Sequence, residues 1–303
     1  MEANKASEKG DFRAGFISFV GRPNVGKSTL TNALVGEKIA ITSPKPQTTR
    51  RAIRAIVHRE NGQIIIVDTP GIHRPRKLLG HRLNDLVTAV LGDVDVIGML
   101  IPATDKIGPG DRFIYEQLKK FPHAKKIAIV TKLDLVNKST AIERLTEVDM
   151  LGEWDAVVPI SAMTGEQLDV LTDLLIEHLP QSPPLYEETQ NTEETNDDRI
   201  AELIREAALY GAREELPHSL AAQVDDRDRD ETGLLHIYAS IFVERESQKE
   251  IIIGRDSANL RRLVRSAKRE IEALEGERIY LSLRVKVLKE WQSDPKFLGR
   301  LGF

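Results

Sequence analysis

Cysteine is absent from the 303 residues of the chain. Its absence excludes disulfide bonds, thiolate metal sites and cysteine nucleophiles. Aromatic residues make up only 5% of the chain, and no uninterrupted apolar run is long enough to span a bilayer. The opening stretch is polar and lacks the apolar segment of a secretory signal. We therefore expect a cytoplasmic protein with no transmembrane segment.

Charge is plentiful and unevenly divided. Charged residues make up 30% and hydrophobic residues 41% of the chain, a composition typical of globular proteins, and the length suits two domains. Residues 244–303 hold 14 basic and 10 acidic residues, a net charge of +4, whereas the rest of the chain carries −8. A basic C-terminal region indicates that a polyanion would bind there, although a solvated helix face would give the same charge pattern.

The first half of the chain alternates apolar, β-branched runs with helical patterns. A buried strand is predicted at residues 15–21 and a helix at about 27–34. Further elements are predicted as strands at 52–58, 63–68, 94–100, 126–131 and 156–160, and as helices at 112–118 and 167–178. This order favours an α/β fold with a mainly parallel sheet and helices on both faces.

The composition changes after Leu179. The stretch from Pro180 to Asp198 has three prolines, six acidic residues and no basic residue, so it cannot bury much apolar surface. We predict a first domain at 1–180, an acidic linker at 181–198 and a second domain at 199–303, with docking of the linker across one domain left open. In the second domain we predict a helix at 200–216, strands at 219–224 and 234–244 joined by a loop, a basic helix at 258–274 and a strand at 278–287.

A complete phosphate-loop pattern follows the first strand. Residues 21–28 read GRPNVGKS and fit G-x-x-x-x-G-K-[ST] without a mismatch. Glycines let successive backbone N–H groups point inward, and the helix N-terminus adds positive potential for phosphates. We expect Lys27 to bridge the β- and γ-phosphates and Ser28 to bind Mg²⁺. The nucleotide cradle is predicted from Gly21, Asn24, Val25, Gly26, Lys27, Ser28 and Thr29.

Three further segments each end a predicted strand. In Asp68-Thr69-Pro70-Gly71 the carboxylate can reach Mg²⁺ through a water, and the N–H of Gly71 can approach the γ-phosphate. In Thr131-Lys132-Leu133-Asp134, the carboxylate of Asp134 can accept hydrogen bonds from guanine N1 and N2, which adenine cannot offer. The N–H of Ala162, after Ser161, would face guanine O6.

On these motifs, residues 21–28, 68–71, 134 and 161–162, the chain closely resembles the Era family of ribosome-associated GTPases. Gln47-Thr48-Thr49-Arg50 resembles that family's first switch segment, which implies that Thr49, or alternatively Thr48, closes over the γ-phosphate and binds Mg²⁺. The stretch from Glu244 to the basic helix, and the ending with Trp291, resemble the family's smaller α+β KH (type II) domain.

Two positions depart from the family pattern. Thr131 stands where the family usually has an asparagine that braces the phosphate loop, so we expect part of that bracing to be lost and nucleotide affinity to be weaker, with guanine preference preserved. Ser257 replaces the second glycine of the KH loop G-x-x-G, which clamps about four nucleotides. We expect RNA binding to survive. The predicted RNA-binding residues are Lys249, Gly254, Arg255, Asp256, Ser257, Arg261, Arg262 and Arg265.

The resemblance implies a GTP/GDP switch with slow turnover. Ile72 occupies the place where Ras-like proteins have a water-orienting glutamine, and an alkyl chain cannot orient water. Asn24 offers a hypothesis: GTPases with asparagine here can bind K⁺ beside the phosphates. Lys27, Asn24, Thr49 and Gly71 are therefore the residues expected to promote hydrolysis.

The implied partners are the small ribosomal subunit and the three-prime end of its rRNA, in subunit assembly. A monomer is expected, with peripheral association at the inner membrane face open. Three alternatives stay open: a nucleotide-binding RNA adaptor with little or no hydrolysis, a P-loop ATPase or small-molecule kinase, and a regulatory GTPase acting on proteins or membranes.

Overall fold

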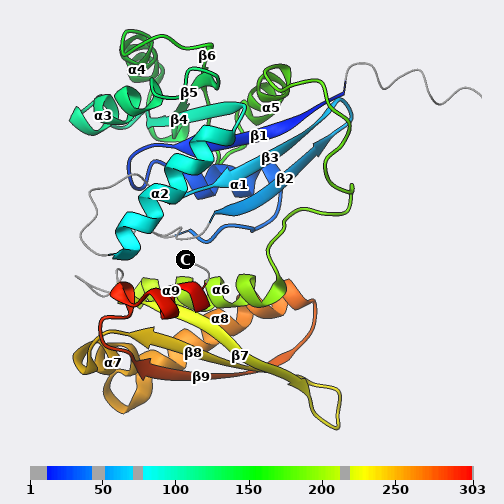
Figure 1. The fold of residues 1–303 in the computed structure, drawn as a ribbon, viewed down its shortest axis with the longest axis vertical. Helices are drawn as coiled ribbons and strands as arrows, with labels where there is room; N and C mark the ends of the chain where they lie inside the picture. Colours follow the sequence, from blue (N-terminus) through cyan, green and yellow to red (C-terminus); the bar gives the residue numbers. More distant parts are fainter. Residues whose placement is uncertain (1–11, 43–51, 71–77, 212–218, 302–303) are drawn as a thin grey trace, which may run out of the picture. The chain divides into compact units, whose positions relative to one another are not determined.

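The computed structural model describes residues 12–42, 52–70, 78–211 and 219–301 (Figure 1). The chain divides into two compact units. Within the described residues, the first unit comprises 12–40, 52–70 and 83–193, and the second comprises 41–42, 78–82, 194–211 and 219–301.

A six-stranded sheet organises the first unit, in the order β2-β3-β1-β4-β5-β6. Only β2 is antiparallel to its neighbour, and the other neighbouring strands are parallel. Strands β3 and β4 are buried along their whole length, as expected for strands covered on both faces. The strands are β1 (Arg13–Val20), β2 (Ile53–Arg59), β3 (Gly62–Asp68), β4 (Val96–Pro102), β5 (Lys125–Thr131) and β6 (Ala156–Pro159).

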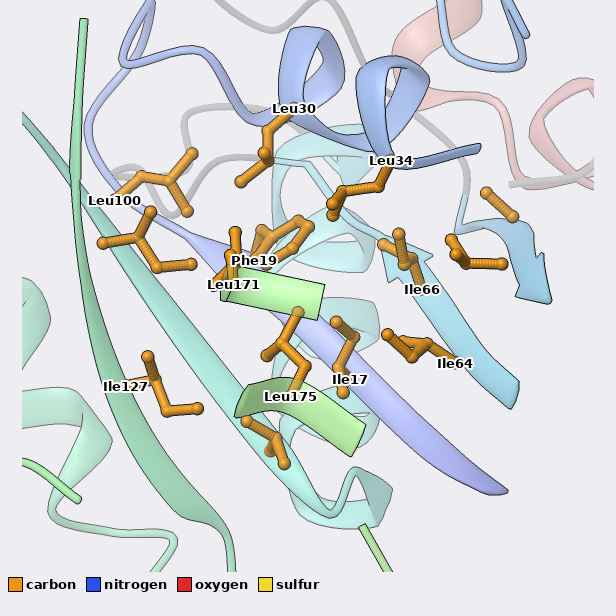
Figure 2. Packing of buried hydrophobic residues seen from close by; sticks show 14 of the residues in the cluster. Ile17, Phe19, Leu30, Leu34, Ile64, Ile66, Leu100, Ile127, Leu171 and Leu175 are labelled. Carbon is orange, nitrogen blue, oxygen red and sulfur yellow. The ribbon is translucent and has the colours of Figure 1, made fainter. Parts of the chain in front are cut away.

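Helices cover both faces of this sheet (Figure 1). On one face, α1 (Lys27–Val35) and α5 (Leu168–Glu177) pack against the side chains of β1, β3, β4 and β5, as Figure 2 shows for Phe19, Leu30 and Leu171. On the other face lie α2 (Leu78–Asp93), α3 (Pro109–Leu118) and α4 (Lys138–Asp149). The strands and helices predicted for the first half are found in the predicted order, and α2 and α4 are helices that the prediction did not name.

Residues 181–193, here called the strap, lie along the first unit. Their backbone meets the outer strand β2: Ile56 N donates to Asn191 O, and Glu193 N donates to Arg54 O. The fully buried amide of Gln63 holds the middle of the strap, accepting from the N–H groups of Leu185 and Tyr186. The acidic segment is therefore docked on one unit through most of its length.

The second unit contains a three-stranded sheet, β7-β8-β9, in which β7 pairs antiparallel with β8 and β8 pairs parallel with β9. The element order is helix, two strands, two helices and a strand. These elements are α6 (Asn196–Gly211), β7 (Ala221–Arg229), β8 (Leu235–Val243), α7 (Glu246–Ile253), α8 (Ala258–Glu275) and β9 (Ile279–Val287). Residues 212–216 of the predicted first helix lie outside the described residues.

Strand β7 is longer than predicted. The sequence predicts a loop at Asp225–Arg229, where all five residues are charged, yet this stretch pairs with β8 beyond a bulge at Val224/Asp226. Its arginines supply the reason: Arg227 forms ion pairs with Asp197 and Glu275, and Arg229 with Glu277. Cross-element charge pairing thus stabilises a strand that propensity alone disfavours.

One face of α8 contributes to the core of the second unit. Leu263, Ala267 and Ile271 recur at four-residue spacing, are buried, and pack with α6 and the sheet. The end of the chain closes this core: Trp291 is fully buried and its Nε1 donates to Ser219 O at 3.0 Å. It lies in the short helix Trp291–Ser293, which is followed by α9 (Pro295–Arg300).

Candidate functional site

The phosphate loop joins β1 to α1 through backbone conformations that require glycine. Gly26 has φ +106° immediately before α1, a conformation that side chains disfavour. At Gly21, φ is +155° and a Cβ would lie 2.7 Å from the carbonyl oxygen of Leu100. Asn24 is also left-handed, with φ +63°. The loop therefore curls as the motif predicts and delivers the first turn of α1 to the carboxyl edge of the sheet.

Two oxygen-bearing side chains meet beside this loop. Asp68 ends β3 and is fully buried, and Ser28 Oγ donates to its Oδ2 at 3.2 Å. A hydroxyl and a carboxylate are hard oxygen ligands of the kind that Mg²⁺ prefers. Two of the three predicted ligands, Ser28 and Asp68, are therefore brought together and fit that ion, whereas Thr49 lies outside the described residues.

Lys27 opens α1 next to Asp68. Desolvation lowers the pKa of the Lys27 ammonium group, and the charge of Asp68 opposes part of that shift. A phosphate placed by the loop would stabilise the charged amine. The adjacent Thr29 lies in the first turn of the same helix.

The end of β5 braces the phosphate loop from one side. The hydroxyl of Thr131, which is 3% exposed, donates to Val25 O at 2.9 Å. Lys132 Nζ donates to Asn24 O at 2.8 Å. The Thr131 hydroxyl therefore contacts the phosphate loop directly. This hydrogen bond retains part of the bracing that the loss of the family's asparagine is expected to weaken.

The predicted base-recognition residues also come together. Asp134 lies in a short helical turn, Leu133–Leu135, and Ser161 Oγ donates to Asp134 Oδ1 at 2.6 Å. Because the Ser161 hydroxyl in turn accepts from Thr164 N, its proton points to the carboxylate. Within the part of the chain that the structure describes, the second oxygen of Asp134 accepts no hydrogen bond, and Ala162 directly follows Ser161.

One loop residue was missed by motif matching. Arg22 Nε donates to Asp111 Oδ1 at 2.8 Å and its Nη2 contacts Asp105 Oδ2 at 3.1 Å. Both aspartates lie between the end of β4 and the first turn of α3. Position 22 is a variable place in the motif, and no sequence signal connects it with residues more than 80 positions away.

The loop of the second unit lies between α7 and α8. Gly254 has φ +73° and ψ 171°, a conformation essentially restricted to glycine. Asp256 and Ser257 are left-handed, with φ of +51° and +58°. The chain thus makes the predicted turn with serine at the second glycine position.

Exposed basic residues follow this loop. Arg255, Arg261, Arg262 and Arg265 are exposed and form no ion pair with the described residues. In contrast, Lys249, Lys268 and Arg269 pair with neighbouring glutamates. The arginines nearest the loop therefore keep their charge available.

Several predicted residues cannot be placed. Thr48, Thr49, Gly71 and Ile72 lie outside the described residues. The described helices include none that combines the length and apolar character needed to cross a membrane.

Fold and site together define the class of protein: a P-loop GTPase followed by a KH domain. Family models agree on both parts. Residues 16–132 match the model described as 50S ribosome-binding GTPase, and residues 215–292 match the model described as KH domain.

The chain belongs to the Era family of GTPases. It is 56% identical over 299 residues to GTPase Era of Mycolicibacterium smegmatis, covering 97% of this chain and 99% of that protein. It is 53% identical over 296 residues to GTPase Era of Corynebacterium diphtheriae, covering 96% and 97%. The resemblance inferred from the motifs is confirmed.

Two solved structures of Era proteins are similar to this chain over nearly its full length. A variant of Aquifex aeolicus Era bound to GDP·AlF4⁻ has a TM-score of 0.91, 34% identity and coverage of 96% of this chain and 99% of that chain. Era in complex with MgGDPNP and nucleotides 1506–1542 of 16S ribosomal RNA has a TM-score of 0.91, 35% identity and the same coverage. The predicted fold class is therefore confirmed.

Proposed function

We propose that this GTPase is a molecular switch that binds the three-prime end of small-subunit rRNA and assists assembly of the small ribosomal subunit. The observation that carries the proposal is the similarity, along nearly the whole chain, to the Era structure that holds MgGDPNP and a 16S rRNA segment. The exposed arginines beside the KH loop support the same partner because they supply charge for RNA phosphates.

The phosphate end of GTP is assigned to the loop 21–28. Its backbone N–H groups and Lys27 bind the phosphates, and Ser28, Asp68 and Thr49 are the residues that would hold Mg²⁺. When bound, Mg²⁺ neutralises charge on the β- and γ-phosphate oxygens. The buried position of Asp68 and its bond from Ser28 support this assignment.

The guanine base is assigned to Asp134, with Ser161 and Ala162. The hydrogen bond from Ser161 orients the Asp134 carboxylate, and in that orientation the carboxylate can accept hydrogen bonds from guanine N1 and N2. An Asp134→Ala variant should lose its preference for GTP over ATP while Ser28 and Lys27 still bind phosphate. Competition between labelled GDP and unlabelled ATP measures this, and an unchanged preference would contradict the assignment.

Hydrolysis is expected to be slow and aided by a monovalent cation. Asn24 would hold K⁺ near the phosphates, while Thr49 and Gly71 would respond to the γ-phosphate. Faster phosphate release in KCl than in NaCl, abolished in Asn24→Ala, is the expected result. Equal rates in the two salts would rule out the cation role.

RNA binding is assigned to residues 254–257 with Lys249 and the first turns of α8. The test is filter binding of an oligonucleotide with the three-prime rRNA sequence, in the presence of a GTP analogue, GDP or ATP. An Arg261→Ala/Arg265→Ala variant should bind several-fold more weakly. Arg269→Ala is the matched control, since this arginine is already paired on the same helix. Equal binding by all three proteins would contradict the assignment.

The second candidate function is an RNA adaptor with little or no hydrolysis. Thr131 favours it because the usual asparagine is absent from the base-binding segment. Phosphate release by the wild type that exceeds that of Lys27→Ala would exclude it. We also propose a cytoplasmic monomer, with any membrane contact peripheral; sedimentation with and without vesicles tests both.

A further inference from the structure

Arg22 lies in the phosphate loop, and its side chain contacts residues outside the loop. It reaches the connection between β4 and α3, where Nε contacts Asp111 and Nη2 contacts Asp105. The Asp111 side chain is 0% exposed. Its second oxygen, Oδ2, accepts from Gly108 N at 2.9 Å, so one carboxylate holds both the guanidinium group and the start of α3.

Burial of Asp111 gives this ion pair its importance. A buried carboxylate without a cation is costly, so Arg22 cannot swing into solvent without leaving that charge unpaired. The stem of Arg22 also packs closely: a Cβ on Gly110 would lie 3.1 Å from Arg22 Cδ. The planar fork of an arginine, unlike an ammonium group, serves two carboxylates at fixed angles.

The end of β5, the strand next to β4, holds two further points of the loop. Lys132 and Thr131 bind the carbonyl groups of Asn24 and Val25. The loop also contains Asn24 in the left-handed region, a conformation that is unfavourable for a residue other than glycine. Attachments at residues 22, 24 and 25 therefore restrain the loop at three positions.

We infer that Arg22, through Asp105 and Asp111, is a positioning residue that preorganises the phosphate loop and thereby slows nucleotide release. The residue acts without touching the nucleotide. An untethered loop samples conformations that cannot bind, and the apparent affinity falls by the fraction lost. The inference rests on nucleotide binding at residues 21–28.

Dissociation of a fluorescent GDP analogue from the full chain, followed by stopped flow, tests the inference. In Arg22→Ala we expect release to be on the order of tenfold faster, as for loss of a hydrogen-bonded charge pair. Arg22→Lys should lie between this variant and the wild type, because it retains charge but not the fork. The KM for GTP should rise more than kcat falls.

Two further variants separate positioning from folding. Asp105→Asn removes only the half-exposed partner and should accelerate release in the same direction; added to Arg22→Ala it should have no further effect. Lys119→Ala removes an exposed ion pair with Glu116 just after α3 and should release nucleotide at the wild-type rate. Melting temperatures are measured for every variant.

A lower melting temperature of Arg22→Ala with an unchanged release rate would overturn the inference, as would a Lys119→Ala effect of equal size. Failure of the wild type to bind the GDP analogue would instead refute nucleotide binding at this loop. The two failures are therefore distinguishable.

Discussion

Replacing Thr131 with valine gives a direct test of how the phosphate loop is held. Valine has nearly the same shape but lacks the hydroxyl that donates to Val25 O at 2.9 Å. Thr131 is 3% exposed and Val25 is 2% exposed, so water cannot readily replace the bond. An orphaned buried carbonyl costs about 1–3 kcal/mol.

That free energy divides between folding and binding. If the loop keeps its shape, the free energy of unfolding of the first unit falls by about 1–3 kcal/mol and affinity is unchanged. If the loop relaxes so that Val25 O reaches water, nucleotide binding must restore the strained geometry. We expect the second response because neighbouring loop residues are exposed, with affinity for GDP falling about tenfold, equivalent to about 1.4 kcal/mol.

The assay is calorimetric titration with GDP beside urea unfolding of the same protein. Thr146→Val is the matched control: its hydroxyl also donates to a carbonyl, that of Ile142, at 3.0 Å, but on an exposed helix face. That variant should match the wild type in affinity. A Thr131→Val protein that binds GDP and unfolds as the wild type does would refute the bracing role of this hydroxyl.

Three other variants test features outside the loop. Gln63→Leu should lower the free energy of unfolding of the first unit by about 2–3 kcal/mol, because it orphans strap groups including the N–H of Tyr186; proteolysis of the strap at the wild-type rate would contradict this. Ser257→Gly should relieve left-handed strain and stabilise the second unit by up to about 1 kcal/mol; an unchanged or lower melting temperature would disagree. The hydrogen bond from the Thr232 hydroxyl is the main cause that lowers the pKa of Asp230 from 3.8 to about 2. Its stabilisation is complete above the unfolded pKa and lost as pH falls through 2, so Asp230→Asn should flatten acid unfolding between pH 4 and 2; an identical acid profile would argue against it.

Sequence patterns predicted the sheet of the first unit because its central strands, such as β3 and β4, are buried on both faces. Runs such as Val96–Ile101 are continuous and apolar, a signal that needs no knowledge of distant partners. The motif residues around Gly21–Ser28, Asp68 and Asp134 were predictable for a related reason: parallel strands bring their carboxyl ends to one edge.

Features that depend on distant partners were not predictable. The strand character of Asp225–Arg229 rests on ion pairs with Asp197, Glu275 and Glu277. The contact of Arg22 with Asp111 joins residues 89 positions apart. Docking of the strap rests on the buried amide of Gln63 and on backbone hydrogen bonds to β2, all with residues more than 100 positions away. Composition gives the charges of such residues but not which of them meet.

The strap also has a consequence for solubility. An outer strand such as β2 carries a row of unpaired backbone groups that can serve as a template for another chain. Asn191 and Glu193 occupy part of that row, and the strap adds acidic side chains and the prolines Pro183 and Pro184, which have no N–H to extend pairing. The acidic segment therefore protects the sheet from self-association, so a chain shortened within it would be prone to aggregate even with an intact nucleotide loop.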